Sequence, residues 1–355
     1  MGLTARIEKI SYEPFLCNSL KRISIVRLHE ALEGGYSFIL SADSNTEFAV
    51  SHWVSPKRTR SYPYVRVYDT LGFTGKKVTI IPVLKDEGLT SGGSGDRDFI
   101  QWDTVSLMSL LNVYVILSFY SEAKPSTKYP GKITKQQFSI KHLESQFVKL
   151  ATFQSSALHW NMEQTEPENM RFLFEGAMAS YDVISKELNV KFHDYNSAIR
   201  KIKKITSSRE QFLASSREAA ESAQRREVLT VQPKEKTKGV KQSITIQNYL
   251  GGKYFLTLDE FRVKGDSVEL IEAKHTKKGC FPSWNDIKDG LLKMILLTNI
   301  TDVKLDERCV SKDVFLKLTS QDPFMVHRLS LKDQCLYKKL LNESRTNGFH
   351  IEHSV

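Results

Sequence analysis

The segment Tyr254–Lys278 most constrains how this chain can fold, because it reads as two apolar strands joined by a tight turn. Its sequence is YFLTLDEFRVKGDSVELIEAKHTKK. The residues Lys264–Ser267 separate the two strands, and the Gly-Asp pair within them supplies the backbone angles that hairpin turns require. The segment therefore predicts an antiparallel hairpin whose strands lie side by side.

Charged residues on these strands form a candidate catalytic site. Side chains alternate between the two faces of a strand, so Glu272 and Lys274 project from one face while Ile271 and Ala273 project from the other. The turn brings Asp259 toward Glu272, and two carboxylates at close range supply the hard oxygen ligands that Mg²⁺ prefers. The simpler interpretation is an exposed strand whose Glu and Lys face solvent, which holds for most isolated E-x-K patterns.

Three neighbouring features favour the site over the simpler interpretation. They are the upstream acid, the apolar residues before the motif (Val268, Leu270 and Ile271) and the basic residues after it (His275, Lys277 and Lys278). The first acid has an alternative, because Glu260 adjoins Asp259. A shift of one residue in strand register would turn Asp259 to the opposite face and put Glu260 in its place.

The residues after the hairpin predict a helix, a strand and a second helix. Residues 281–300, FPSWNDIKDGLLKMILLTNI, have helical periodicity, with Ser283 or Asn285 as the N-cap. The apolar face of this helix consists of Ile287, Leu291, Met294 and Ile295. Residues 314–320 predict a strand and residues 330–348 a final helix.

A hairpin that carries D-x12-E-x-K and is followed by a long amphipathic helix and a strand resembles the core of the PD-(D/E)xK nuclease superfamily, which includes Type II restriction endonucleases. The resemblance covers about the last third of the chain. It implies an α/β fold with a restriction-endonuclease-like core, a mixed β-sheet flanked by helices. It also implies that Asp259 and Glu272 bind Mg²⁺ and that Lys274 belongs to the catalytic centre. One departure is Leu258, which stands where the family motif has proline.

The preceding two thirds of the chain predict a β-rich and helical N-terminal region. Strands are expected at residues 36–42, 47–54, 64–71 and 77–84, a helix at 99–112, a buried strand at 113–120, and mainly helices from 134 to 190. Residues 207–242 are highly charged, and the Pro- and Gly-containing lysine block 232–241 predicts a boundary. We therefore divide the chain into an N-terminal region for DNA recognition (1–206), a charged helix and linker (207–242) and a catalytic region (243–355).

Charge indicates an anionic partner. Lys and Arg number 51 against 41 Asp and Glu, which leaves a net charge of +10. Basic residues alternate with aromatic ones between residues 52 and 68, where they can follow phosphates while rings stack on bases; a surface loop with core tyrosines explains the same pattern equally well. The candidate DNA-binding residues are Lys57, Arg58, Arg60, Arg66, Lys277 and Lys278. Lys288 and Lys293 add positive charge near the hairpin.

A second polar cluster lies in the N-terminal region. Lys85 and Asp86 end one predicted strand, and Asp96 and Asp98 precede the predicted helix at 99–112. A second catalytic centre is conceivable here, but the order of residues differs from acid-x-Lys after a hairpin. DNA contact or structural pairing is the preferred interpretation, since charged strand ends are usually solvated turns.

Together these observations predict a Mg²⁺-dependent DNA endonuclease, most economically a sequence-specific Type II restriction enzyme. Cutting both strands of a palindromic duplex favours a homodimer, because the two-fold axes of protein and DNA then match. The chain has no apolar run long enough to cross a bilayer and no secretory signal, so a cytoplasmic location is expected. The alternatives are a non-catalytic DNA-binding protein, and a repair or defence nuclease of the same superfamily without sequence specificity or acting on RNA.

Overall fold

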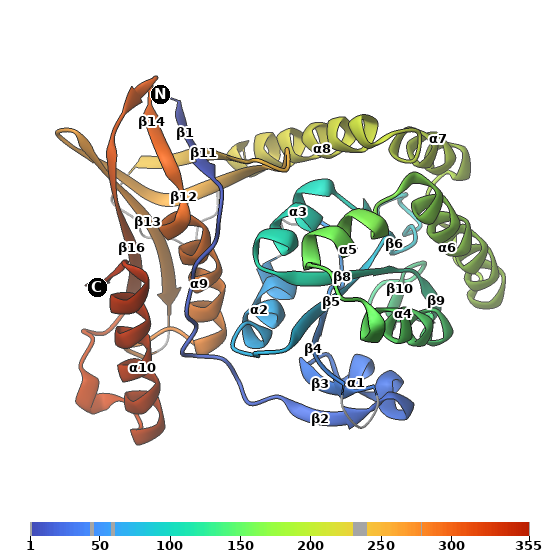
Figure 1. Cartoon of the computed structure of the whole chain (residues 1–355), viewed down its shortest axis with the longest axis horizontal. Helices are drawn as coiled ribbons and strands as arrows, with labels where there is room; N and C mark the ends of the chain where they lie inside the picture. The colour runs from blue at the N-terminus through green and yellow to red at the C-terminus, as the bar shows by residue number, and fades with distance from the viewer. Residues whose placement is uncertain (1, 43–45, 58–60, 230–239, 278, 355) are drawn as a thin grey trace. The chain divides into compact units, whose positions relative to one another are not determined.

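A computed structural model describes residues 2–42, 46–57, 61–229, 240–277 and 279–354. The chain divides into two compact units (Figure 1). One comprises Ser19–Ala219 and is called the N-terminal unit. The other comprises Met1–Asn18 together with Ala220–Val355 and is called the C-terminal unit. The lysine block predicted as a boundary lies almost entirely outside the described residues.

An eight-stranded mixed sheet forms the C-terminal unit, in the order β15-β14-β1-β11-β12-β13-β16-β17. Its strands are β1 (Leu3–Ile7), β11 (Val240–Asn248), β12 (Lys253–Lys264), β13 (Ser267–Thr276), β14 (Thr301–Leu305), β15 (Arg308–Cys309), β16 (Ser311–Ser320) and β17 (His350–Ser354). Its helices are the end of α8 (Arg209–Leu229), α9 (Trp284–Asn299), the short 3-10 helix η2 (Val326–Arg328) and α10 (Leu331–Asn347).

The expected hairpin is confirmed. Strands β12 and β13 pair antiparallel from Glu260 and Ile271 to Lys264 and Ser267, and Gly265 in the turn has a φ of +60°. Strand β16 then pairs parallel with β13, and β17 pairs parallel with β16. Helix α9 follows the hairpin, as predicted.

Both long helices of this unit start and pack as their sequences require. Ser283 is the N-cap of α9 and accepts a hydrogen bond from the Asp286 N–H, while Ser330 caps α10 in the same way. Helix α9 packs on β13 and β16, and α10 packs on β17 (Figure 1). The register places Lys274, Leu318 and His353 on one sheet face, and contacts of α9 with Lys274 and of α10 with His353 show that both helices cover that face.

Residues 3–7 fall within the predicted N-terminal region 1–206, but they form strand β1 of the C-terminal sheet. Strand β1 pairs parallel with β11 and antiparallel with β14. Local sequence does not reveal this, because strand partners more than 200 positions away are chosen by backbone hydrogen bonding and packing.

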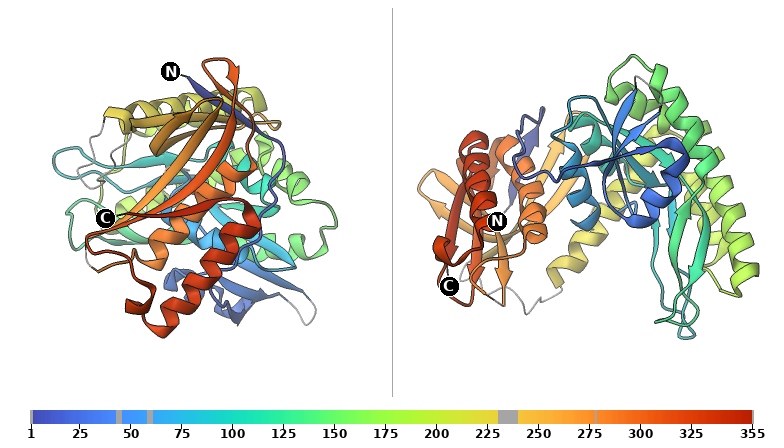
Figure 2. Two further views of the ribbon diagram at one scale, coloured as in Figure 1. Left: turned by 90° about the vertical axis from the view of Figure 1, so that its left-hand side faces the viewer. Right: turned by 90° about the horizontal axis from the view of Figure 1, so that it is seen from below.

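A five-stranded sheet, in the order β2-β3-β4-β5-β8, organises the N-terminal unit. Its strands are β2 (Lys21–Ser24), β3 (Phe38–Ser41), β4 (Glu47–His52), β5 (Lys76–Pro82) and β8 (Val113–Ser118). Two hairpins accompany it, β6 (Leu84–Asp86) with β7 (Arg97–Phe99) and β9 (Tyr120–Pro125) with β10 (Ile133–Phe138). Figure 2 shows the second hairpin as a teal two-stranded ribbon.

The helices of this unit are η1 (Ile25–Arg27), α1 (Leu28–Gly34), α2 (Ser61–Thr70), α3 (Trp102–Leu110), α4 (Ile140–Thr152), α5 (Ala157–Gln164), α6 (Pro167–Leu188), α7 (Tyr195–Ile205) and most of α8. Of these, α2, α3, α4 and α5 pack on strands of the five-stranded sheet. One hydrophobic core cluster joins sheet residues such as Phe48 to Phe147 of α4 and Trp160 of α5. No helix of the described residues is both long and apolar enough to cross a membrane.

One predicted strand is wrong. Residues 64–71 were expected to be a strand because apolar and polar residues alternate there, but residues 61–70 form helix α2. Arg66, Val67 and Tyr68 are all buried, which the two-residue alternation of a half-buried strand would not produce. Pro63 lies in the first turn of α2, where its missing N–H has no helical partner to lose.

Candidate active site

The hairpin register assigns each acid to a face of the sheet. Glu260 pairs with Ile271 across the hairpin, so the two side chains share a face, and Glu272 lies on the other. Glu260 is buried and forms ion pairs with Arg262 at 2.6 Å and Lys317 at 2.7 Å. It therefore belongs to a separate network, and Asp259 is the acid on the face of Glu272.

Asp259 lies where the two hairpin strands separate. The regular pairing of β12 with β13 stops at Glu260 and Ile271. One residue further along, the Asp259 Oδ2 accepts a hydrogen bond of 2.8 Å from the Ala273 N–H. Only 7% of Asp259 is exposed. The Asp259 carboxylate thus takes the place of a backbone carbonyl as the acceptor for the Ala273 N–H, and this bond holds it beside the backbone of the E-x-K motif.

Glu272 is the centre of the cluster and is 1% exposed. Its Oε1 lies 2.8 Å from the Lys274 Nζ, and its Oε2 accepts a hydrogen bond of 2.5 Å from the Lys293 Nζ. Lys293 also donates to the Thr257 carbonyl at 3.1 Å. A buried carboxylate needs such charged partners, because its desolvation costs several kcal/mol.

Helix α9 supplies the outer half of the cluster. Asp289 accepts a hydrogen bond of 2.7 Å from the Lys274 Nζ, and Lys293 lies four residues later on the same helix face. Gly290 makes room for Lys274 beneath the helix. A Cβ atom at this position would lie 3.2 Å from the Lys274 Cε and 2.7 Å from Leu316 Cδ1. We therefore expect a larger residue at 290 to clash with Leu316 and to crowd the Lys274 side chain.

The pKa values follow from these contacts. Burial raises the pKa of the Glu272 carboxyl, but the ammonium groups of Lys293 and Lys274 outweigh burial and hold the pKa below its ordinary value. Burial lowers the pKa of Lys274, yet Glu272 and Asp289 raise it further than burial lowers it. The pKa of Lys293 is raised against burial by Glu272 and Asp259. At neutral pH, Glu272 is therefore a carboxylate between two ammonium groups.

Asp259 and Glu272 are the carboxylates of this cluster that could hold a hard divalent cation. Counted in ionised form, the carboxylates of Asp259, Glu272 and Asp289 exceed the ammonium groups of Lys274 and Lys293 by one negative charge. The described part of the chain contains no group of three or more His, Cys, Asp or Glu side chains that could hold a metal ion. Two protein carboxylates completed by water and phosphate oxygens are the usual protein site for Mg²⁺.

A second ionic network covers the opposite face of the hairpin. Arg262 contacts Glu260, Glu269 at 3.2 Å and Glu352 at 3.3 Å, while Lys317 contacts Glu260 and Glu352. The pKa of Glu260 is lowered because Lys317 and Arg262 outweigh the effect of burial. These charges link β12, β13, β16 and β17, so we regard this network as structural.

The predicted DNA-binding residues are in different environments. Lys277 is exposed just beyond β13, whereas Lys57 forms an ion pair with buried Asp98. Arg66 is 9% exposed and its Nη1 lies 2.8 Å from the His52 Nε2. Arg58, Arg60 and Lys278 lie outside the described residues. Of the described candidates, only Lys277 presents its side chain to solvent as a phosphate contact requires.

The second polar cluster of the sequence consists of separate structural pairs. Asp98 accepts a hydrogen bond of 2.5 Å from Ser55 in addition to its ion pair with Lys57. Asp86 lies 2.9 Å from the His193 Nδ1, and Lys85 lies 2.7 Å from Glu87. Of the two preferred interpretations, DNA contact and structural pairing, structural pairing accounts for Lys85, Asp86 and Asp98.

Sequence reasoning missed Asp289 and treated Lys293 only as nearby positive charge. Their signal was present, because Asp and Lys four positions apart on the helix after an E-x-K strand share one helix face. What the sequence lacked was the rotation of that helix against the sheet. Comparisons of the chain with protein-family models, with curated proteins and with solved structures found no match.

Proposed function

We propose that the chain is a Mg²⁺-dependent endodeoxyribonuclease with a restriction-endonuclease-like core. The observation that carries the proposal is the convergence of Asp259, Glu272 and Lys274 on one sheet face, with Glu272 fully buried between two ammonium groups. Such a cluster costs folding energy, and perturbed charges of this kind concentrate at functional sites.

The fold around the cluster supports the proposal. The resemblance to the PD-(D/E)xK superfamily calls for a hairpin with the three motif residues, then a long amphipathic helix, then a strand in a mixed sheet. Strands β12 and β13, helix α9 and the parallel strand β16 follow in that order. The motif residues also lie on the face that α9 covers.

Each residue has a distinct role in phosphodiester hydrolysis. Asp259 and Glu272 would hold Mg²⁺, which when bound withdraws charge from the phosphate and makes its bound water more acidic. Lys274 stays protonated because its pKa is raised, so it stabilises negative charge on the phosphate and donates hydrogen bonds rather than removing a proton. Asp289 and Lys293 are positioning residues that orient Lys274 and Glu272.

The substrate class follows from charge. A net charge of +10 favours a polyanion, and double-stranded DNA is the substrate the superfamily resemblance implies. Within this proposal, a sequence-specific Type II restriction enzyme acting as a homodimer in the cytoplasm is the preferred biological role. A nuclease without sequence specificity, a nuclease acting on RNA and a non-catalytic DNA-binding protein are the alternatives that the experiment must separate.

Incubation of the purified chain with a supercoiled plasmid of known sequence and Mg²⁺ tests the proposal. We expect discrete fragments whose ends map to one site, and no cleavage by Glu272→Ala or in excess EDTA. Asp313→Asn is the matched control, since Asp313 is exposed on neighbouring strand β16. A smear would indicate a nuclease without sequence specificity. If plasmid and RNA both stay intact at every Mg²⁺ concentration, the nuclease proposal is wrong and a non-catalytic DNA-binding protein is the remaining alternative.

A further inference from the structure

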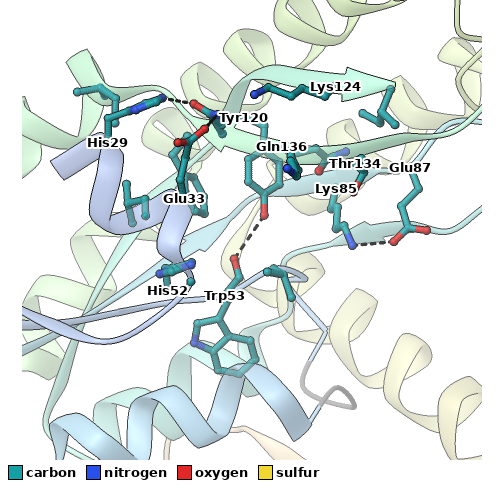
Figure 3. A pocket seen from close by; sticks show the side chains of 18 of the residues that line it. His29, Glu33, His52, Trp53, Lys85, Glu87, Tyr120, Lys124, Thr134 and Gln136 are labelled. Carbon is teal, nitrogen blue, oxygen red and sulfur yellow. Dashed lines mark hydrogen bonds and ion pairs between the residues drawn. The ribbon is translucent and has the colours of Figure 1, made fainter. Parts of the chain in front are cut away.

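The N-terminal unit contains a cavity of about 550 Å³ that the nuclease site does not use. It lies at the carboxyl ends of the parallel strands β4, β5 and β8, which end at or shortly before His52, Lys85 and Tyr120. The hairpin of β9 and β10 and helix α1 supply further walls (Figure 3). In open α/β sheets, this edge is where ligands bind.

His52 lines the cavity and carries a hydrogen-bond donor that no described residue accepts. Its Nε2 lies 2.8 Å from the Arg66 Nη1, and a guanidinium only donates, so Nε2 is the acceptor and Nδ1 carries the proton. Burial and the Arg66 charge lower the pKa of His52 to about 3, which keeps the ring neutral. The residue is 95% buried, and its Nδ1 has no hydrogen-bond partner among the described residues.

Gln136 also lines the cavity and carries an acceptor to which no described residue donates. Its Nε2 donates a hydrogen bond of 2.6 Å to the Asp86 carbonyl, which fixes the orientation of the amide. Its Oε1 is buried and has no partner in the part of the chain that the structure describes. A buried polar atom left unpaired costs about 1–3 kcal/mol, so each such atom calls for a ligand or water.

A strand irregularity turns this part of β10 toward the cavity. The pairing of β10 with β9 shifts register between Thr134 and Gln137, and Lys135 has a φ of +50°. Consecutive residues of a regular strand would face opposite sides, yet Lys135, Gln136 and Gln137 all line the cavity. Positive φ at a lysine is a strained conformation, and such strain concentrates at functional sites.

Aromatic rings and cations complete the cavity. Tyr120 and Phe138 lie with ring centroids 4.6 Å apart, and both line the wall. Four cationic side chains line the cavity against two carboxylates, Glu33 and Glu87. Two of these cations, Lys124 and Lys135, are exposed at the rim and form no ion pair with any described residue. Phosphate groups bind to lysines of this kind.

We propose that this cavity binds one nucleobase together with its 5′-phosphate. A donor from His52 and an acceptor from Gln136 complement the donor and acceptor pattern that every nucleobase presents on its edge, Tyr120 and Phe138 supply apolar ring surface, and the rim lysines contact the phosphate. The nucleotide is either a base turned out of a DNA strand or a free mononucleotide. The first source rests on the proposed nuclease function, whereas the second does not.

Calorimetric titration with the four deoxynucleoside 5′-monophosphates tests the cavity directly. We expect at least one to bind. Gln136→Leu should weaken nucleotide binding about five-fold through the lost hydrogen bond. The rim variant, Lys124→Ala combined with Lys135→Ala, leaves the interior of the cavity intact and should weaken nucleotide binding about ten-fold. Lys128→Ala combined with Lys141→Ala is the control, because it also removes two positive charges, but from exposed positions outside the cavity lining. This control variant should bind the nucleotide as the native chain does.

A DNA duplex with 2-aminopurine opposite an abasic site distinguishes the sources, since an unpaired base is the easiest to extrude. A rise in 2-aminopurine fluorescence that both cavity variants diminish assigns the cavity to a DNA base. Binding of mononucleotides without that rise assigns it to a free nucleotide. If neither probe binds, or if the control variant loses as much as the rim variant, the inference is wrong. Plasmid cleavage by the same preparations reports separately on the nuclease proposal.

Discussion

Replacement of Glu272 by glutamine should destabilise the C-terminal unit strongly. The side chain keeps its shape but loses the charge that holds Lys274 at 2.8 Å and Lys293 at 2.5 Å. Removing one partner from a buried ion pair costs about 3–5 kcal/mol, because the remaining charge stays buried without compensation. At about 1.4 kcal/mol for each factor of ten, hydrogen exchange in β13 should accelerate between about 140-fold and about 3700-fold.

Native-state hydrogen exchange measured by mass spectrometry is the assay, with peptides that cover residues 267–276 and 284–299. It reports on each unit separately, so it does not require the whole chain to unfold in one step. Asp313→Asn is the control, and an exposed substitution of this kind should change stability by less than about 0.5 kcal/mol.

The double variant Glu272→Gln with Lys293→Met tests whether the two side chains compensate each other's charge. If the loss in Glu272→Gln comes from stranded ammonium groups, removal of Lys293 relieves part of it, and the double variant is more stable than the sum of the single losses by about 1–3 kcal/mol. Strictly additive losses would show that Glu272 and Lys293 do not interact as the structure describes. The interpretation of the cluster as a mutually compensated charge group would then be abandoned.

The stabilisation by Glu272 should also depend on pH. Its folded-state pKa is lowered by Lys293 and Lys274 against burial, so its contribution is present above the unfolded value of about 4.3 and is lost as pH falls through the folded value. The difference in exchange between the native chain and Glu272→Gln, corrected for intrinsic rates, should therefore shrink below pH about 4. A difference that stayed constant would contradict the lowered pKa.

Three further predictions concern Lys274, the salt dependence of DNA binding, and His52. Lys274→Ala should keep DNA affinity in a gel-shift assay but lose cleavage by at least about 100-fold; cleavage at the normal rate would remove Lys274 from the catalytic centre. DNA affinity should fall linearly on a log-log plot against salt, because several phosphates are neutralised, and a flat plot between low and moderate salt would count against phosphate contacts. Burial and Arg66 hold the pKa of His52 at about 3, below its unfolded value of about 6.5, so the N-terminal unit should lose stability as pH falls between these values, and His52→Gln should flatten that dependence of β4 exchange.

Several elements around the site were predictable because their signals are local. The Gly-Asp turn, the apolar strands of the hairpin and the Ser283 cap each act within a few residues, and the structure has all three. Helix α2 was not predictable in this way. Its alternation from Tyr64 to Leu71 suits a strand, but the surrounding unit buries Arg66, Val67 and Tyr68 together in a helix.

The sequence by itself determined which residues form the hairpin and that Glu272 and Lys274 share a face, because side-chain alternation along a strand is a property of the backbone. Only the tertiary structure decided that Asp259 rather than Glu260 lies with Glu272, because that depends on the register and on where the strands separate. It also decided that Asp289 and Lys293 complete the cluster, since the rotation of α9 is set by packing on the sheet. The physical reason is common to both cases: backbone periodicity assigns faces locally, whereas charge partners are assigned by contacts between segments distant in the chain.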